Sequence, residues 1–212
     1  MFKTRGTFIT LEGIDGCGKS TQTEMLINKF SELGVDYIQV REPGGTAAGE
    51  AIRQILLDNR YSLLLQTELL LYMAARSELT EEIIIPALKA GKVVLCDRFT
   101  DSTLAYQGYG GGANLEWIRI LNNNATCGIT PDLTILLDLP VEDALKRRIN
   151  KADRMESKDY HFHQRVRLGY LELASVEPYR IKVLKATEER DSLHFKIWAL
   201  AEKLIDDSKR AF

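Results

Sequence analysis

The stretch Glu12–Thr21, EGIDGCGKST, constrains the fold of this 212-residue chain more than any other part of the sequence. It matches G-x-x-x-x-G-K-[ST], a loop whose backbone N–H groups and lysine hold the phosphates of a nucleotide. A β-prone run, Thr7–Leu11, precedes the loop, and apolar residues at helical spacing follow it from Lys19 to Leu33. Because the motif functions between a strand and a helix, this context favours a nucleotide-binding loop over a chance glycine turn.

Short apolar runs alternate with helical patterns along the rest of the chain. The predicted strands are Thr7–Leu11, Asp36–Val40, Lys92–Cys96, Leu133–Leu137 and the weaker Arg180–Leu184. The predicted helices are Lys19–Leu33, Ala48–Asp58, Gln66–Ala90 with a bend or break at Pro86, one that starts at Val141, and Asp191–Asp206. This alternation predicts an α/β fold with a parallel sheet covered by helices on both faces. We expect one domain over residues 1–212, with the polar run Asn150–Asp159 as a mobile segment.

The composition narrows the choice of partners and of compartment. Hydrophobic residues make up 45% of the chain and charged residues 27%, and the net charge is -2. This balance argues against general binding to a nucleic-acid backbone, so phosphate chemistry must rest on local arginines and lysines. The three cysteines, Cys17, Cys96 and Cys127, are few and odd in number, which predicts reduced thiols and a cytoplasmic location. No apolar run approaches the ~20 residues that span a bilayer, so we expect no membrane partner.

The loop residues have distinct expected tasks. Lys19 can reach the β- and γ-phosphates, and the Ser20 hydroxyl can ligate Mg²⁺. Asp97, at the end of the predicted strand Lys92–Cys96, suits Mg²⁺ binding, although it could instead cap the next helix. Asp15 is unexpected in an anion site, and most simply it hydrogen-bonds nearby backbone. We expect the nucleotide to contact Gly13, Asp15, Gly16, Cys17, Gly18, Lys19, Ser20 and Thr21.

Other phosphate-loop classes fit the chain less well than a small kinase. Asn150-Lys151-Ala152-Asp153 matches the guanine-binding pattern of GTPase switches, but it lies well beyond the nearest predicted strand, at the end of a charged helix. No D-x-x-G switch segment follows an apolar strand, and the chain lacks room for the coupling domain of a motor ATPase. The sequence therefore favours a kinase that acts on a metabolite.

Five segments, in order along the chain, resemble the thymidylate kinase family. They are EGIDGCGKST, REPGGT at Arg41–Thr46, LLLYMAAR at Leu69–Arg76, DRFTDSTLAYQG at Asp97–Gly108 and PDLTILLDLP at Pro131–Pro140. The resemblance implies a P-loop NTPase-type sandwich with a five-stranded parallel sheet and a mobile lid at about residues 147–159. It also implies a homodimer that phosphorylates dTMP to dTDP with ATP and Mg²⁺, by direct in-line transfer, in dTTP biosynthesis.

The resemblance assigns roles to acceptor-side residues. Arg41 looks like a clamp on the phosphate of dTMP, for which its guanidinium fork is suited, and Arg98 looks like a second contact near the transferring group. Asp15 would bind the 3′-hydroxyl. Tyr72 would stack on thymine and Arg76 would hydrogen-bond its edge; by spacing alone they would be a core residue and a surface charge.

The DRFTDSTLAYQG segment supplies further expected contacts. Ser102 and Thr103 resemble polar positions beside the thymine ring, and Gln107 resembles a contact to base or sugar. Tyr106 resembles a tyrosine that crowds the 2′ position and so favours deoxyribose. Alternatively, this segment merely starts a helix with Tyr106 in its core.

The lid is expected to supply a cation. Some relatives carry an arginine in the loop directly after the acid, where this chain has Gly16. Charge that develops during phosphoryl transfer needs a positive group, so we expect Arg154 first, and then Arg148, to act from the lid. Arg147 would contact the nucleotide, with a solvent-facing helix position as its alternative.

Two rival functions remain open. One is a kinase for another nucleotide or nucleoside with the same fold. The other is a nucleotide-dependent switch without acceptor chemistry, which would not need the pair Arg41 and Arg98.

Overall fold

A five-stranded parallel sheet forms the centre of the computed structural model, which describes residues 6–147 and 153–210. The strands lie in the order β2-β3-β1-β4-β5. Their bounds are β1 (Thr7–Glu12), β2 (Tyr37–Arg41), β3 (Val93–Asp97), β4 (Leu133–Asp138) and β5 (Ile181–Lys185). All five predicted strands are confirmed, and none of their observed bounds differs from the predicted one by more than one residue.

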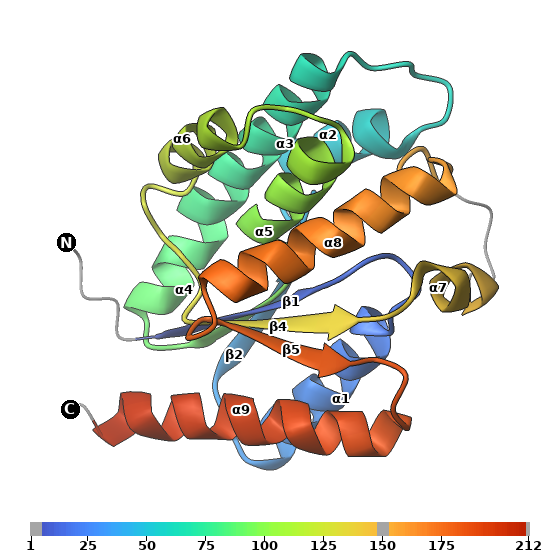
Figure 1. Cartoon of the computed structure of the whole chain (residues 1–212). Coiled ribbons are helices and arrows are strands. Elements are labelled where there is room, and N and C mark those ends of the chain that lie inside the picture. The colour runs from blue at the N-terminus through green and yellow to red at the C-terminus, as the bar shows by residue number, and fades with distance from the viewer. Residues whose placement is uncertain (1–5, 148–152, 211–212) are drawn as a thin grey trace.

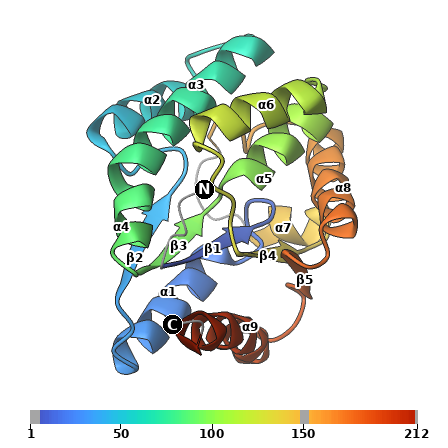
Figure 2. The same ribbon diagram turned by 90° about the vertical axis from the view of Figure 1, so that its left-hand side faces the viewer.

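Helices cover both faces of the sheet, as predicted (Figures 1 and 2). One face carries α1 (Lys19–Glu32) and α9 (Arg190–Arg210). The other face carries α2 (Ala47–Leu57), α3 (Leu65–Leu79), α4 (Ile85–Lys89), α5 (Thr100–Thr103), α6 (Leu115–Ala125) and α8 (Tyr160–Val176). The short α7 (Val141–Arg147) lies beyond the carboxyl ends of the strands. The result is the three-layer arrangement of a P-loop NTPase.

The sheet is buried on both sides, which explains why its strands are continuous apolar runs. Every residue of β1 is buried, and successive side chains point to opposite faces. Phe8 belongs to the apolar cluster that contains Leu79 and Ile84, whereas Ile9 belongs to the cluster that contains Leu26 and Ile197. The central strand therefore holds the two helical layers together.

Pro86 does not break its helix completely. After α3, the chain widens into a π-helical turn, η1 (Thr80–Ile84), and continues directly into α4. Proline lacks the N–H that an α-helix needs, and a wider turn accommodates this loss. A second π-helical stretch, η2 (Leu104–Gly110), follows α5.

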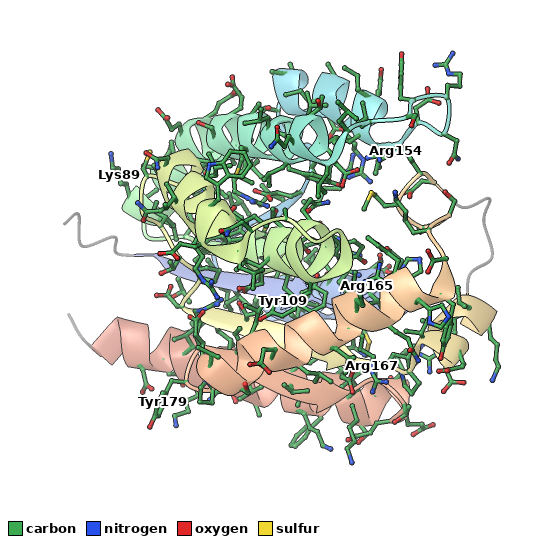
Figure 3. All side chains as sticks on the ribbon, turned by 45° about the horizontal axis from the view of Figure 1, so that its top comes forward. Lys89, Tyr109, Arg154, Arg165, Arg167 and Tyr179 are labelled. Carbon is green, nitrogen blue, oxygen red and sulfur yellow. The ribbon has the colours of Figure 1, made fainter. Side chains whose placement is uncertain are left out.

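Helix α8 was not among the predicted elements, and it packs tightly across η2. A Cβ on Gly169 of α8 would lie 2.6 Å from Cβ of Tyr109, and a Cβ on Gly110 would lie 2.7 Å from Val166. Arg165 donates two hydrogen bonds to the carbonyl oxygen of Gly110 across the same junction, where Figure 3 labels Tyr109 and Arg165. This close approach brings Tyr170, which lies within α8, into contact with Glu12 at the end of β1.

Of the predicted lid, residues 148–152 lie outside the described residues. In the two described ranges, no helix is both long enough and apolar enough to cross a membrane.

Candidate nucleotide-binding site

A cavity of about 860 Å³ opens at the carboxyl ends of the central strands. It is bounded by the phosphate loop, the loop after β2, α3, the segment from Asp97 to Gln107, and the loop between β5 and α9. Ligands of open α/β sheets bind at this edge. The predicted site residues in its wall are Asp15, Gly16, Cys17, Gly18, Lys19, Ser20, Thr21, Arg41, Tyr72, Arg76, Asp97, Arg98, Ser102, Thr103, Tyr106, Gln107 and Arg147.

The phosphate loop adopts a backbone that depends on its glycines. Gly13, Gly16 and Gly18 all have positive φ, at 136°, 86° and 100°. A Cβ on Gly16 would lie 2.6 Å from the carbonyl oxygen of Ala144 in α7, so a larger residue is excluded on steric grounds as well. The ammonium group of Lys19 donates to the carbonyl oxygens of Gly13 (3.0 Å) and Ile14 (3.2 Å), and so lies over the loop. In this structure, the close approach of α7 therefore leaves no room for a side chain at position 16.

Asp15 and Arg98 form an ion pair inside the cavity. The Tyr106 hydroxyl also donates to Asp15 (2.9 Å), and the Arg98 guanidinium lies 5.0 Å from the centroid of the Tyr106 ring. Burial acts to raise the pKa of Asp15, but the charges of Arg98 and Lys19 outweigh it and hold the pKa well below its usual range. Arg98 has φ 69°, a conformation that costs about 1 kcal/mol or more and is found at functional sites.

Glu12, at the end of β1, forms hydrogen bonds that connect β1 to residues 99–102 and to α8. Its buried carboxylate accepts hydrogen bonds from the Phe99 N–H (2.7 Å), the Ser102 hydroxyl (2.6 Å) and the Tyr170 hydroxyl of α8 (2.8 Å). Burial raises the pKa of Glu12 to about 7, and the charge of Asp101 adds to this effect. Sequence reasoning missed Glu12 and Tyr170, although an acid at the end of an apolar strand was a usable signal.

Arg76 is fully buried and donates all five of its N–H groups within the protein. Glu42 accepts from Nε and Nη2, Phe99 accepts through its carbonyl oxygen, and Thr103 and Asn122 accept from Nη1. A hydrogen bond from Arg76 to a base would therefore require one of these bonds to be exchanged.

Asp97 has one carboxylate oxygen that is buried and, among the described residues, without a hydrogen-bond partner. The next helix, α5, has Phe99 at its N-cap position and no side-chain cap, so Asp97 does not serve as its cap. An unpaired buried carboxylate oxygen fits a nearby cation. Over residues 6–147 and 153–210, no cluster of three or more acidic, histidine or cysteine side chains could hold a metal alone. Mg²⁺ commonly takes only one or two protein ligands and completes its shell with phosphate oxygens and water.

The three lid arginines have different surroundings. Arg154 does not line the cavity: Nη1 donates to Glu68 of α3 (2.5 Å), and Nε donates to the carbonyl oxygen of Leu56 in α2 (2.6 Å). Figure 3 shows it beside the layer formed by these helices. Arg147 does line the cavity and donates to the carbonyl oxygen of Ala186 (3.2 Å). Arg148 lies outside the described residues.

Several cavity residues were not predicted. They are Gln22, Glu42, Pro43, Arg53, Leu57, Asp153, Met155, Glu156, Ala186, Glu188, Arg190 and Leu193. Of the last four, two come from the loop between β5 and α9 and two from the first turn of α9, a stretch that has no recognisable motif. Its position after a predicted parallel strand was the available signal, because all such loops meet at one edge of the sheet.

A phosphate loop on a parallel sheet, with two further arginines in the wall of the same cavity as its lysine, defines a P-loop kinase. The thymidylate kinase family model matches residues 11–197. The thymidylate kinase of Kosmotoga olearia is 49% identical over 90% of this chain and 92% of its own length, and that of Caldanaerobacter subterraneus subsp. tengcongensis is 45% identical over 97% and 99%. The crystal structure of thymidylate kinase from Ehrlichia chaffeensis superposes with a TM-score of 0.77 at 36% identity, covering 92% of this chain and 98% of that one.

The chain belongs to the thymidylate kinase family, whose members phosphorylate dTMP to dTDP with ATP in dTTP biosynthesis.

Proposed function

We propose that this chain transfers the γ-phosphoryl group of ATP directly to dTMP in the cavity described above. The proposal is supported above all by the fact that residues expected to bind ATP and residues expected to bind dTMP line one cavity. Lys19 and Ser20 of the phosphate loop face the same space as Arg41 and Arg98, so one cavity offers cationic groups to two phosphorylated substrates. Transfer between bound phosphates depends on positioning and electrostatic stabilisation, and it requires no covalent enzyme intermediate.

The donor side is assigned to the phosphate loop. The backbone amides of residues 13–21 and the Lys19 ammonium group would bind the ATP phosphates, while the loop between β5 and α9 would face the base. Ser20 and the unpaired oxygen of Asp97 would hold Mg²⁺, which would neutralise part of the negative charge of the ATP phosphates. Arg147 would contact the donor from the end of α7.

The acceptor side is assigned to Asp15 and to three other parts of the wall, which are the loop after β2, helix α3 and the segment from Asp97 to Gln107. Arg41 and Arg98 would bind the dTMP phosphate, and Asp15 would accept a hydrogen bond from the 3′-hydroxyl. Tyr72 would stack on thymine and Tyr106 would crowd the 2′ position. The base edge would face Arg76, Ser102, Thr103 and Gln107.

The lid is proposed to supply the positive charge that Gly16 cannot. Arg154 would have to leave Glu68 and Leu56 to reach the transferring group, so its role requires the segment around residues 147–159 to close over the cavity. Arg148 is the second candidate, and Arg147 already faces the cavity.

We propose a cytoplasmic homodimer. The three cysteines are free thiols, which supports a reducing compartment. Exposed apolar side chains on the neighbouring helices α3 and α6 (Leu70, Trp117 and Ile120) support self-association through that surface.

A substrate panel tests the proposal. Purified protein with ATP and Mg²⁺ is offered dTMP, dUMP, dCMP and dGMP separately, and nucleoside diphosphate formation is measured. We expect the highest kcat/KM with dTMP. Preference for dCMP or dGMP would favour the rival nucleotide kinase, and ATP hydrolysis without dTDP would favour the switch.

A further inference from the structure

We propose that Glu50 of α2 is a positioning residue that holds Arg41 in place to bind the phosphate of the acceptor. This role rests on the acceptor contact proposed for Arg41. It concerns a carboxylate that lies outside the cavity wall and outside every motif recognised in the sequence.

The contact between the two side chains uses only one nitrogen of the Arg41 guanidinium group. Both carboxylate oxygens of Glu50 accept hydrogen bonds from Nη2 of Arg41, each at 3.0 Å. Within the described part of the chain, this leaves Nε and Nη1 of Arg41 for a different anion. A guanidinium group can bind anions along more than one edge. Glu50 can therefore hold one nitrogen while a phosphate binds the others.

Arg41 needs such support because its own surroundings do little to orient it. Its side chain is 54% exposed, and it is a long chain of rotatable bonds at the end of β2. An arginine that moves freely loses conformational entropy when it binds a phosphate. A partner that restricts the arginine side chain before the phosphate binds reduces this loss of entropy. This is how a positioning residue strengthens binding.

Glu50 is itself fixed to the loop that follows Arg41. Its Oε1 accepts the Gly45 N–H (2.9 Å), and a Cβ on Gly44 would collide with the same oxygen. Gly44 and Gly45 have φ of 133° and 88°, so the loop folds around the carboxylate. The hydrogen bond from Gly45 and the charge of Arg41 lower the pKa of Glu50, which keeps it ionised. Glu50 thus holds both the loop at Gly44 and Gly45 and the side chain of Arg41 in fixed positions relative to each other.

A second arginine near Arg41 gives the Glu50 carboxylate a further role. Arg53 lies one turn further along α2, lines the cavity and donates to the carbonyl oxygen of Pro43 (2.7 Å). Burial lowers the pKa of Arg53, the charge of Arg41 lowers it further, and the charge of Glu50 opposes both. Glu50 therefore reduces the repulsion between two cations that face the same cavity.

The test compares binding of dTMP and of thymidine, which lacks the phosphate, by calorimetry. In Glu50→Gln, the amide oxygen can still accept the Gly45 N–H, but the charge that holds Arg41 is lost. We expect the Kd for dTMP to rise about tenfold and the Kd for thymidine to stay within about twofold. In the Arg41→Ala background, the additional Glu50→Gln change should have no further effect on dTMP. Glu116→Gln, an exposed glutamate in the first turn of α6, is the matched control and should bind like the wild type.

Four outcomes would overturn the role of Glu50: an unchanged or lower Kd for dTMP in Glu50→Gln, equal weakening for thymidine, a full effect in the Arg41→Ala background, or the same loss in Glu116→Gln. A lower Kd would identify Glu50 as a competitor of the phosphate. Failure of the wild-type protein to bind dTMP would instead overturn the proposed function, and this role with it.

Discussion

Asp15 and Arg98, both proposed to bind the acceptor, form an ion pair with each other. Arg98 also contacts Gly13, Ser102, Tyr106 and Tyr170, so the phosphate loop, α5, η2 and α8 converge on one guanidinium group. A substitution at Asp15 has two possible routes to the acceptor: loss of a bond to the 3′-hydroxyl, or release of Arg98.

Asp15→Asn separates these routes. A hydrogen bond to a charged group is worth about 1.5–3 kcal/mol, so the Kd for dTMP should rise at least about tenfold. Binding of 3′-deoxythymidine monophosphate, measured in the same way, should be the same in the variant and the wild type, because this ligand has no 3′-hydroxyl. Equal weakening for both ligands would show that Asp15 acts through Arg98 instead.

Glu12 should make folding stability depend on pH. Its pKa in the folded protein is about 7, against 4.5 for an ordinary glutamate side chain. The folded state therefore holds a proton between these values that the unfolded state has lost. The stabilisation is complete below about pH 4.5 and disappears as the pH rises through 7. The charges that face Glu12 are Arg98 and Asp101, and its neutral partners are Ser102 and Tyr170.

The measurement is urea denaturation at pH 5.5 and pH 8. Between these values, the free energy of unfolding of the wild type should fall more than that of Glu12→Gln, whose amide does not titrate. Parallel pH dependence in the two proteins would contradict the prediction. The opposite effect of Asp15, whose pKa is depressed, belongs to a lower range, below about pH 4.

At the scale of elements, Glu68 contacts both an arginine of the proposed lid and a residue proposed to bind the acceptor. This buried α3 residue accepts from Arg154 (2.5 Å) and from the Gln107 amide of η2 (2.7 Å). Helix α3 therefore lies between the turn that carries Arg154 and a residue proposed to face the base. Movement of the lid arginine would change the partner of the same carboxylate that orients Gln107.

Arg154→Met tests both the link and the lid. It leaves the Glu68 carboxylate buried without its cation, so the free energy of unfolding should fall by about 3 kcal/mol. It should also lower kcat at saturating substrates at least about tenfold, since a transferring phosphoryl group loses an arginine, with the Kd for dTMP nearly unchanged. The double variant Arg154→Met/Glu68→Gln removes the stranded charge and should regain stability but not kcat. Glu68→Gln alone is its control, and a normal kcat in the stable double variant would assign the role to Arg148 or Arg147.

At the scale of the whole molecule, the parallel sheet brings distant segments to one edge. Residues in the ranges 15–22, 41–43, 97–107 and 186–193 lie at or after the ends of parallel strands, and they line one cavity because these strands end on the same side. Residues of α3 in the range 72–76 line it as well. Helix α8 joins them through the close contact at Gly110 and Gly169. The phosphate loop, Arg41 and Arg98 therefore come together only in the folded chain.

Sequence patterns that span only a few residues were sufficient to predict the sheet, the phosphate loop and α1. Apolar strand runs, glycine positions and helical spacing act over a few residues, so these elements follow from local chemistry. The π-helical turn before Pro86 and the packing of α8 on η2 depend on neighbours far along the chain, and no local pattern predicts them. The hydrogen-bond partners of the long side chains likewise cannot be predicted from a local pattern.

Arg76 and Arg154 illustrate the physical reason. Their residue types and positions are evident in the sequence, but each has several rotatable bonds and chooses its acceptor from whatever the fold brings near. Folding directs Arg76 onto Glu42 and Arg154 onto Glu68, each partner lying far away in the sequence. The sequence alone is enough to determine that this chain builds a nucleotide-phosphate site on a parallel sheet. Tertiary packing decides which charges meet there, because ion pairs form between neighbours in space.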